Sequence, residues 1–214
     1  MVAAASVVVA SPAFAQATKQ PTKEFTAGVA WLGPASFGSA SADLLRPNGT
    51  TLSLFNTENS LGSGFGLRAG FGFKLKPALW AEFAGGYGWQ PLKTKITDDF
   101  EDADIEPISS SVQRFSLEGA VLWYFRTKGK THWFVRGSGA WAKELAEGNA
   151  LAEDAFIGNG SVGIRRWWKQ DTRTGKATGF RATFGADFQS GGLTLGEKKL
   201  RVSPTATFSI VFGF

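Results

Sequence analysis

The stretch of residues 200–214, LRVSPTATFSIVFGF, decides the fold class of this sequence. Its even-numbered positions are apolar up to the final residue, whereas the odd-numbered positions carry Arg201, four Ser or Thr residues, Val211 and Gly213. A period of two is typical of a β-strand whose two faces meet different surroundings. Pro204 has no N–H group to donate, so we expect it at a bulge or near a rim.

The same alternation recurs along the chain in segments of about ten residues, the length of a tilted strand that crosses a membrane. It is clear in residues 65–75, 79–89, 113–125, 133–141 and 180–189, and less regular in 25–32 and 158–168. No run of 18 or more apolar residues occurs, which excludes a transmembrane helix. With residues 200–214, the pattern predicts eight strands.

The predicted connections alternate in length. Residues 76–77, 126–130 and 170–177 form short turns, whereas 34–63, 90–111, 143–157 and 190–199 form longer loops. Hydrocarbon offers no hydrogen-bond partners, so a spanning sheet must close on itself. The fold class is therefore predicted to be all-β: one closed antiparallel up-and-down transmembrane β-barrel of eight strands, with the short turns in the periplasm and the loops outside.

Aromatic residues gather near both kinds of connection, and the 27 Gly suit a barrel wall. One predicted girdle, beside the short turns, contains Trp123, Tyr124, Phe125, Trp133, Phe134, Trp167, Trp168 and Phe180. The other, beside the long loops, contains Trp31, Tyr87, Trp89 and Trp141. Two girdles are expected where a barrel meets the two membrane interfaces.

The first residues read as the remnant of a secretory signal peptide. Residues 2–10 are apolar, Pro12 follows, and Ala13-Phe14-Ala15 fits the small-x-small rule for cleavage before Gln16. No Lys or Arg precedes the apolar run, which we attribute to a start codon assigned too far downstream. The predicted domains are residues 1–15, the signal remnant, and residues 16–214, the barrel.

The stretch 207–214, TFSIVFGF, resembles the C-terminal signature of outer-membrane proteins, in which alternating apolar residues end in Phe. Together with the export signal and eight strands, the chain resembles the small porin-like or OmpA/OmpX-type barrels of Gram-negative bacteria. The resemblance implies location in the outer membrane, contact with its lipid and lipopolysaccharide, and recognition of the last strand by the barrel-assembly machinery. The assembly signal would consist of Phe208, Ile210, Phe212 and Phe214.

The inward faces of the predicted strands are rich in charge. They carry Arg68, Glu82, Arg114, Glu118, Arg136, Arg165, Arg181, Asp187 and Arg201. Eight strands enclose an interior just wide enough for side chains, and buried charges require partners. We therefore expect a plug of Arg–carboxylate pairs in a lumen with net positive charge, with an anion-selective path as the alternative.

Other kinds of chemistry have less support. Asp98, Asp99, Glu101, Asp102, Asp104 and Glu106 lie close together in one loop, but without the Gly-centred spacing of an EF-hand, so we predict a solvated loop with divalent bridging as the alternative. No cofactor is expected, and the scattered cations do not indicate nucleic-acid binding. The single histidine, His132, has no acid nearby to form a triad, so no enzymatic activity is predicted.

Two functions remain open from the sequence. The first is a structural or interaction barrel that presents extracellular loops, with a possible protein partner at those loops. The second is a narrow channel or carrier for small apolar or anionic molecules, resembling OmpW-like barrels. The second is favoured by the apolar residues of the first loop, which are Leu44, Leu45, Leu52, Leu54 and Phe55.

Overall fold

The computed structural model describes residues 20–45, 51–97, 108–126, 129–146, 151–171, 173–193, 196 and 199–214. Ten strands form one antiparallel sheet. They are β1 (Lys23–Leu32), β2 (Ala35–Leu45), β3 (Thr51–Leu61), β4 (Gly64–Lys76), β5 (Leu79–Thr97), β6 (Ile108–Arg126), β7 (Thr131–Ala146), β8 (Leu151–Gln170), β9 (Ala177–Gly191) and β10 (Leu200–Gly213). Among these residues there is no helix long and apolar enough to cross a membrane.

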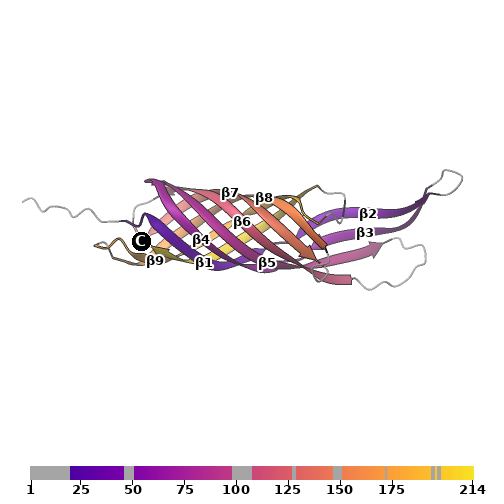
Figure 1. Ribbon diagram of the computed structural model, residues 1–214, viewed down its shortest axis with the longest axis horizontal. Helices are drawn as coiled ribbons and strands as arrows, with labels where there is room; N and C mark the ends of the chain where they lie inside the picture. Colours follow the sequence, from indigo (N-terminus) through magenta and orange to yellow (C-terminus); the bar gives the residue numbers. More distant parts are fainter. Residues whose placement is uncertain are drawn as a thin grey trace, which may run out of the picture.

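Eight of the strands close into a ring, in the order β5, β4, β1, β10, β9, β8, β7 and β6, with β6 pairing back to β5 (Figure 1). The closing pair joins the start of the chain to its end, because β1 runs beside β10 from Glu24↔Gly213 to Leu32↔Thr205. Closure leaves no open edge in the ring, as a sheet in hydrocarbon requires. The predicted fold class is confirmed.

The two ends of the ring differ. Short turns join β4 to β5, β6 to β7 and β8 to β9 at one end, which we call the turn end. The remaining connections lie at the other end, which we call the loop end, and there the strands project well past the ring (Figure 1). Strands β5, β6 and β8 have 19, 19 and 20 residues, about twice what a tilted strand needs to cross hydrocarbon.

The first predicted loop, residues 34–63, is largely a β-hairpin of β2 and β3. The hairpin continues the barrel wall, since β3 pairs with the outer part of β5 from Leu61↔Leu92 to Asn56↔Thr97. The Gln90 side chain donates hydrogen bonds to the carbonyls of Gly33 and Gly62 at the base of the hairpin, each 3.0 Å long. The side chains of Leu44, Leu45, Leu52, Leu54 and Phe55 lie outside the described residues.

The predicted faces hold in all six of the clearly alternating segments. On β10, Val202, Phe208, Ile210 and Phe212 are exposed on the outer face, whereas Arg201, Thr205 and Ser209 are buried inside. Pro204 lies one residue past the last β1–β10 pair, and its carbonyl accepts a hydrogen bond from the Gly33 N–H. The nitrogen of Pro204, which has no hydrogen to donate, therefore faces the side of β10 on which β1 has already ended. This agrees with the predicted position near the rim.

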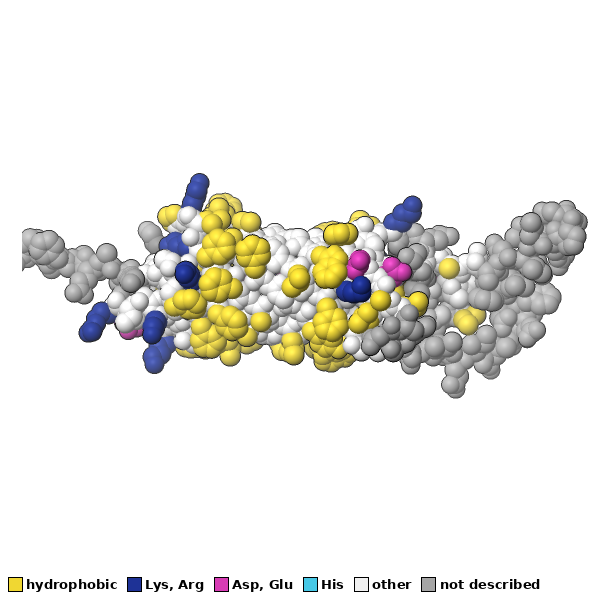
Figure 2. All heavy atoms as spheres, in the orientation of Figure 1, with side chains coloured by type: hydrophobic (Ala, Val, Ile, Leu, Met, Phe, Trp, Pro, Cys, Tyr) yellow, Lys and Arg dark blue, Asp and Glu magenta, His cyan; other side chains and the backbone are white. Residues whose placement is uncertain are grey.

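The outer surface carries two bands of apolar side chains (Figure 2). Trp123, Phe125, Trp133 and Trp168 are exposed near the turn end, and Trp89 and Trp141 near the loop end. The girdle prediction was wrong for Tyr124, Phe134 and Trp167, which are at most 2% exposed and point into the lumen. Each occupies an inward position of its strand. The alternation of inward and outward positions along the strand (its parity) therefore predicts the face correctly, whereas the distance from a turn does not.

Candidate functional site

The lumen of the barrel is filled by charged side chains from all eight strands of the ring. At its turn-end half lie Arg68, Arg136, Arg165 and Arg181, facing Glu24, Glu82 and Glu118, and we call these seven residues the lower network. At its loop-end half lie Arg114, Arg201, Glu144 and Gln189, which we call the upper network. The structure thus places all nine predicted lumen residues inside the barrel and joins eight of them in these two networks.

Glu82 of β5 is the hub of the lower network. Its side chain is 2% exposed. One carboxylate oxygen accepts hydrogen bonds from Arg68 at 2.8 Å and Arg136 at 3.4 Å, and the other pairs with Arg181. Three guanidinium groups from β4, β7 and β9 therefore share one carboxylate across the lumen. Planar Arg forks suit such shared contacts because each presents several N–H donors.

Glu118 and Glu24 complete the lower network. Glu118 pairs with Arg68 at 2.8 Å and with Arg136 at 2.6 Å. Glu24 pairs with Arg165 at 2.7 Å and also with Arg181. Glu24 lies on β1, but it precedes the predicted segment, residues 25–32, and is therefore absent from the predicted lumen set. It joins the first strand of the chain to two of the last.

The upper network centres on Glu144 of β7, which is fully buried. Its carboxylate accepts from Arg114 at 2.9 Å, Arg201 at 3.2 Å and Gln189 at 2.7 Å, and from the backbone N–H of Leu193 at 3.1 Å. Sequence reasoning placed Glu144 in a loop. The strand continues to Ala146, however, and the signal was the alternation of Ala142, Glu144 and Ala146 beyond Trp141.

Asp187 is the one predicted lumen residue outside both networks. It accepts a hydrogen bond of 2.7 Å from Asn159, and both line a cavity of about 100 Å³ between the networks. Arg114 and Arg136 reach this cavity from opposite ends. A space of this size with several polar side chains in its lining can hold a few hydrogen-bonded waters.

With Glu24 and Glu144 included, six arginines face five acids among the described residues of the lumen. The expected positive charge is therefore reduced to a formal surplus of one.

Aromatic rings close the lumen at the turn end. Trp80, Tyr124 and Phe134 pack in one buried cluster. The Arg165 guanidinium lies 4.2 Å from the centre of the Tyr124 ring and 4.8 Å from that of Trp167, in cation–π contacts. We call Trp80, Tyr124, Phe134 and Trp167 the aromatic floor. Because Arg165 is held between these rings and Glu24, the aromatic floor is joined to the lower network.

His132 packs against this floor and is 5% exposed, so it lies inside the barrel wall and not on the outer surface. Its Nε2 lies 2.9 Å from the Gly129 carbonyl, and its Nδ1 lies 3.1 Å from the Arg165 guanidinium. Because the guanidinium can only donate, Nδ1 must accept and Nε2 must carry the proton. Both ring nitrogens are thus engaged in structural hydrogen bonds.

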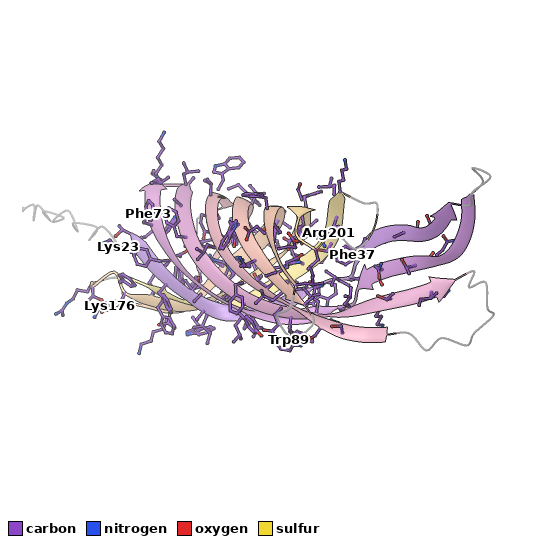
Figure 3. All side chains as sticks on the ribbon, turned by 45° about the vertical axis from the view of Figure 1, so that its right-hand side comes forward. Lys23, Phe37, Phe73, Trp89, Lys176 and Arg201 are labelled. Atoms are coloured by element: carbon purple, nitrogen blue, oxygen red, sulfur yellow. The ribbon has the colours of Figure 1, made fainter. Side chains whose placement is uncertain are left out.

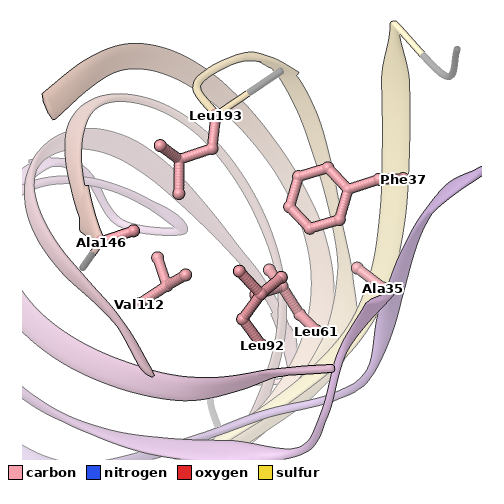
Figure 4. Close-up of a cluster of buried hydrophobic side chains, with 7 residues drawn as sticks. All are labelled: Ala35, Phe37, Leu61, Leu92, Val112, Ala146 and Leu193. Atoms are coloured by element: carbon pink, nitrogen blue, oxygen red, sulfur yellow. The ribbon is translucent and has the colours of Figure 1, made fainter. Parts of the chain in front are cut away.

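An apolar cap closes the loop end (Figure 4). It consists of Ala35, Phe37, Leu61, Leu92, Val112, Ala146 and Leu193, which pack together from five strands and the β9–β10 connection. Phe37 of the hairpin also lies against Arg201, with 4.4 Å between the guanidinium and the ring centre (Figure 3). The hairpin base therefore seals the upper network from the space above it.

The other predicted site residues are placed as follows. Phe208, Ile210, Phe212 and Phe214 are 42–52% exposed on the outer face of the barrel. The acidic residues Asp98, Asp99, Glu101, Asp102, Asp104 and Glu106 lie outside the described residues, as do residues 1–15. Within the part of the chain that the structure describes, no group of His, Cys, Asp and Glu side chains is arranged to hold a metal ion.

Two solved structures similar to this chain are outer-membrane proteins. The outer-membrane protein OprG from Pseudomonas aeruginosa is 12% identical, with 93% of this chain and 98% of that chain covered and a TM-score of 0.57. Neisserial surface protein A is 11% identical, with 89% and 97% covered and a TM-score of 0.50. Neither a protein-family model nor a curated protein sequence matches the chain. The chain therefore has the eight-stranded β-barrel fold of the small outer-membrane proteins.

Proposed function

We propose that this protein is a structural and interaction barrel of the bacterial outer membrane, whose lumen is plugged and whose hairpin and long strands are presented at the cell surface. The observation that carries the proposal is the double closure of the lumen. The lower network with its aromatic floor blocks one end, and the upper network with its apolar cap blocks the other. The side chains of Glu82, Arg181 and Phe134 are almost completely buried, which argues against a water-filled path beside them.

The channel alternative would need that path. The cavity of about 100 Å³ lies between the networks, and the polar side chains in its lining are tied by hydrogen bonds such as that from Asn159 to Asp187. Moving an ion through would require breaking several buried ion pairs, and each leaves an uncompensated charge in a narrow space. These contacts favour the structural and interaction role.

Purified protein in planar bilayers is expected to give no steady conductance. The cap variant Phe37→Ala with Leu193→Ala should also stay silent, because the lower network and the aromatic floor still block the turn end. Single-channel recording at both voltage polarities provides the measurement. Reproducible open-channel current steps from the unmodified protein would contradict the proposal. If only the cap variant gave such steps, the apolar cap, and not the networks, would be what blocks the lumen.

The orientation is testable because the chain has no cysteine. Ser39 on the hairpin and Arg173 in the β8–β9 turn are both exposed. In intact cells, a maleimide polymer too large for porins should label Ser39→Cys and leave Arg173→Cys unlabelled. Permeabilising the outer membrane should then expose Arg173→Cys to the reagent. The reverse order of labelling would mean that the hairpin faces the periplasm.

A further inference from the structure

The turn end carries a dense set of cations that the lumen networks do not use. Eight described Lys and Arg side chains lie there against one described exposed acid, Asp171: Lys23, Lys74, Lys76, Lys130, Arg166, Lys169, Arg173 and Lys176. We call these eight residues the basic collar. Figure 2 shows cationic side chains beyond the apolar band at this end, and Lys23 and Lys176 are labelled there in Figure 3.

The collar cations form few contacts with acids among the described residues: the charge of Lys176 acts on Asp171, but the two do not form an ion pair. Every lumen arginine takes part in an ion pair, but none of the ion pairs among the described residues includes a collar side chain. Asp171 is occupied locally, since it accepts hydrogen bonds from the Thr174 hydroxyl and the backbone N–H of Arg173. These bonds lower the pKa of Asp171 and keep it ionised, yet one carboxylate leaves most of the surrounding positive charge unbalanced.

The loop end does not share this imbalance. Its described exposed cations, Lys93, Lys95, Lys143 and Lys199, accompany the acids Glu58, Glu153 and Asp154. Lys143 and Asp154 lie 3.7 Å apart and form a surface ion pair. The excess of positive charge among the described residues is therefore a property of the turn end, and not of the exposed surface in general.

The collar lies at the depth where headgroups would be. Arg166 is exposed beside the turn-end aromatic band, directly opposite Phe180 in the β8–β9 ladder. Phe180 in turn packs on Trp168, with 6.0 Å between the ring centres. Aromatic bands mark the boundary between hydrocarbon and headgroups, and long cationic side chains extend from that boundary toward charged groups.

We propose that the basic collar binds the phosphates of anionic phospholipids in the leaflet that surrounds the turn end. The ligand class is a glycerophospholipid with net negative charge, such as phosphatidylglycerol. A ring of cations on β1, on the ends of β4 and β8 and in the turns can contact several headgroups at once, and such contacts add favourable energy for each cation near the surface. With the orientation proposed above, this leaflet is the periplasmic one.

Quenching of tryptophan fluorescence by brominated lipids tests the proposal, because the lipid-facing tryptophans separate by end. A reporter with Trp31, Trp89 and Trp141 replaced by Phe senses lipid at the turn end through Trp123, Trp133 and Trp168. The matched reporter with Trp123, Trp133 and Trp168 replaced by Phe senses the loop end. Each is reconstituted in phosphatidylcholine vesicles that contain either brominated phosphatidylglycerol or brominated phosphatidylcholine at equal fraction.

We expect the turn-end reporter to favour phosphatidylglycerol over phosphatidylcholine by about three-fold or more, and the loop-end reporter to show a ratio near one. The variant Arg166→Gln, Lys169→Gln, Lys176→Gln removes three of the eight collar cations and should lower the turn-end ratio. High salt should bring it to near one. The control Lys93→Gln, Lys95→Gln, Lys199→Gln should leave it unchanged.

Equal ratios at the two ends, or a turn-end ratio that survives the triple substitution, would overturn the proposal. Charge-dependent co-sedimentation with peptidoglycan in the absence of a lipid preference would also overturn it and would assign the cations to the cell wall. The assay reads both ends of the purified protein in vesicles. Its failure is therefore distinguishable from failure of the conductance or labelling experiments.

Discussion

Glu82→Gln is expected to destabilise the barrel by about 3–5 kcal/mol. Gln has nearly the same shape but no charge, so Arg68, Arg136 and Arg181 would keep their buried positions with one carboxylate fewer. Urea titration of protein refolded in phosphatidylcholine vesicles, followed by tryptophan fluorescence, would measure the change in the free energy of unfolding. Glu153→Gln is the matched control, because Glu153 is exposed at the loop end, and its effect should stay within about 0.5 kcal/mol.

A double substitution sharpens this prediction. Removing one guanidinium as well, in Glu82→Gln with Arg181→Met, relieves part of the unbalanced charge, so the two changes should cost less together than the sum of each alone. Strict additivity would show that Glu82 and Arg181 do not act as a pair. An unfolding free energy for Glu82→Gln that equals the unmodified value would show that the lumen charges are hydrated, which the plug does not allow.

Phe83→Arg is expected to cost about 2–4 kcal/mol, because a charged side chain at the middle of the lipid-facing surface must enter hydrocarbon. Phe83 is 64% exposed on the outer face of β5, midway between the turn-end and loop-end bands. The same urea titration in vesicles measures the cost. If the outer surface of the ring faced water, the substitution would have almost no effect.

The depth dependence supplies the control for this prediction. Leu75 is 52% exposed on the same outer surface but lies at the turn end between Lys74 and Lys76. Leu75→Arg should therefore cost only about 0–1 kcal/mol, as found for positions near an interface. Equal costs at Phe83 and Leu75 would contradict the assignment of the two bands to the two membrane interfaces.

The sequence predicted the ring because a period of two is imposed on every strand that separates lipid from a packed lumen. Where both conditions hold, as on β4, β9 and β10, the alternation is regular and the faces were assigned correctly. It is weak on β1, where Ala27, Gly28 and Ala30 are small enough for either face, and the predicted segment began one residue after Glu24. Past the membrane, water replaces lipid on the outer face, so the outer ends of β5 and β8 no longer alternate clearly and were read as loops. On β7 the alternation persists as Ala142, Glu144 and Ala146, and it was missed.

The partners inside the lumen could not be predicted in the same way. Parity places Glu82, Arg136 and Arg181 on the inner face, but it does not state which strand faces which across the barrel. The pairing depends on closure and on the relative stagger of the strands, which hydrophobic pattern alone does not encode. Tyr124 and Phe134 were misassigned for a different reason. Their proximity to a turn suggested an interface, whereas their strand parity directs them inward.

Closure of the wall between β1 and β10 also has a consequence for the time course of folding. Glu24 binds Arg165 and Arg181, partners 141 and 157 positions away along the chain. Contacts with such separations form late and slow the search for the native state. An early hairpin such as β4–β5 holds Glu82 without most of its cations, so half-built intermediates gain little from the lumen charges. We therefore expect insertion to be slow and cooperative, because the barrel becomes stable only when β1 has paired with β10.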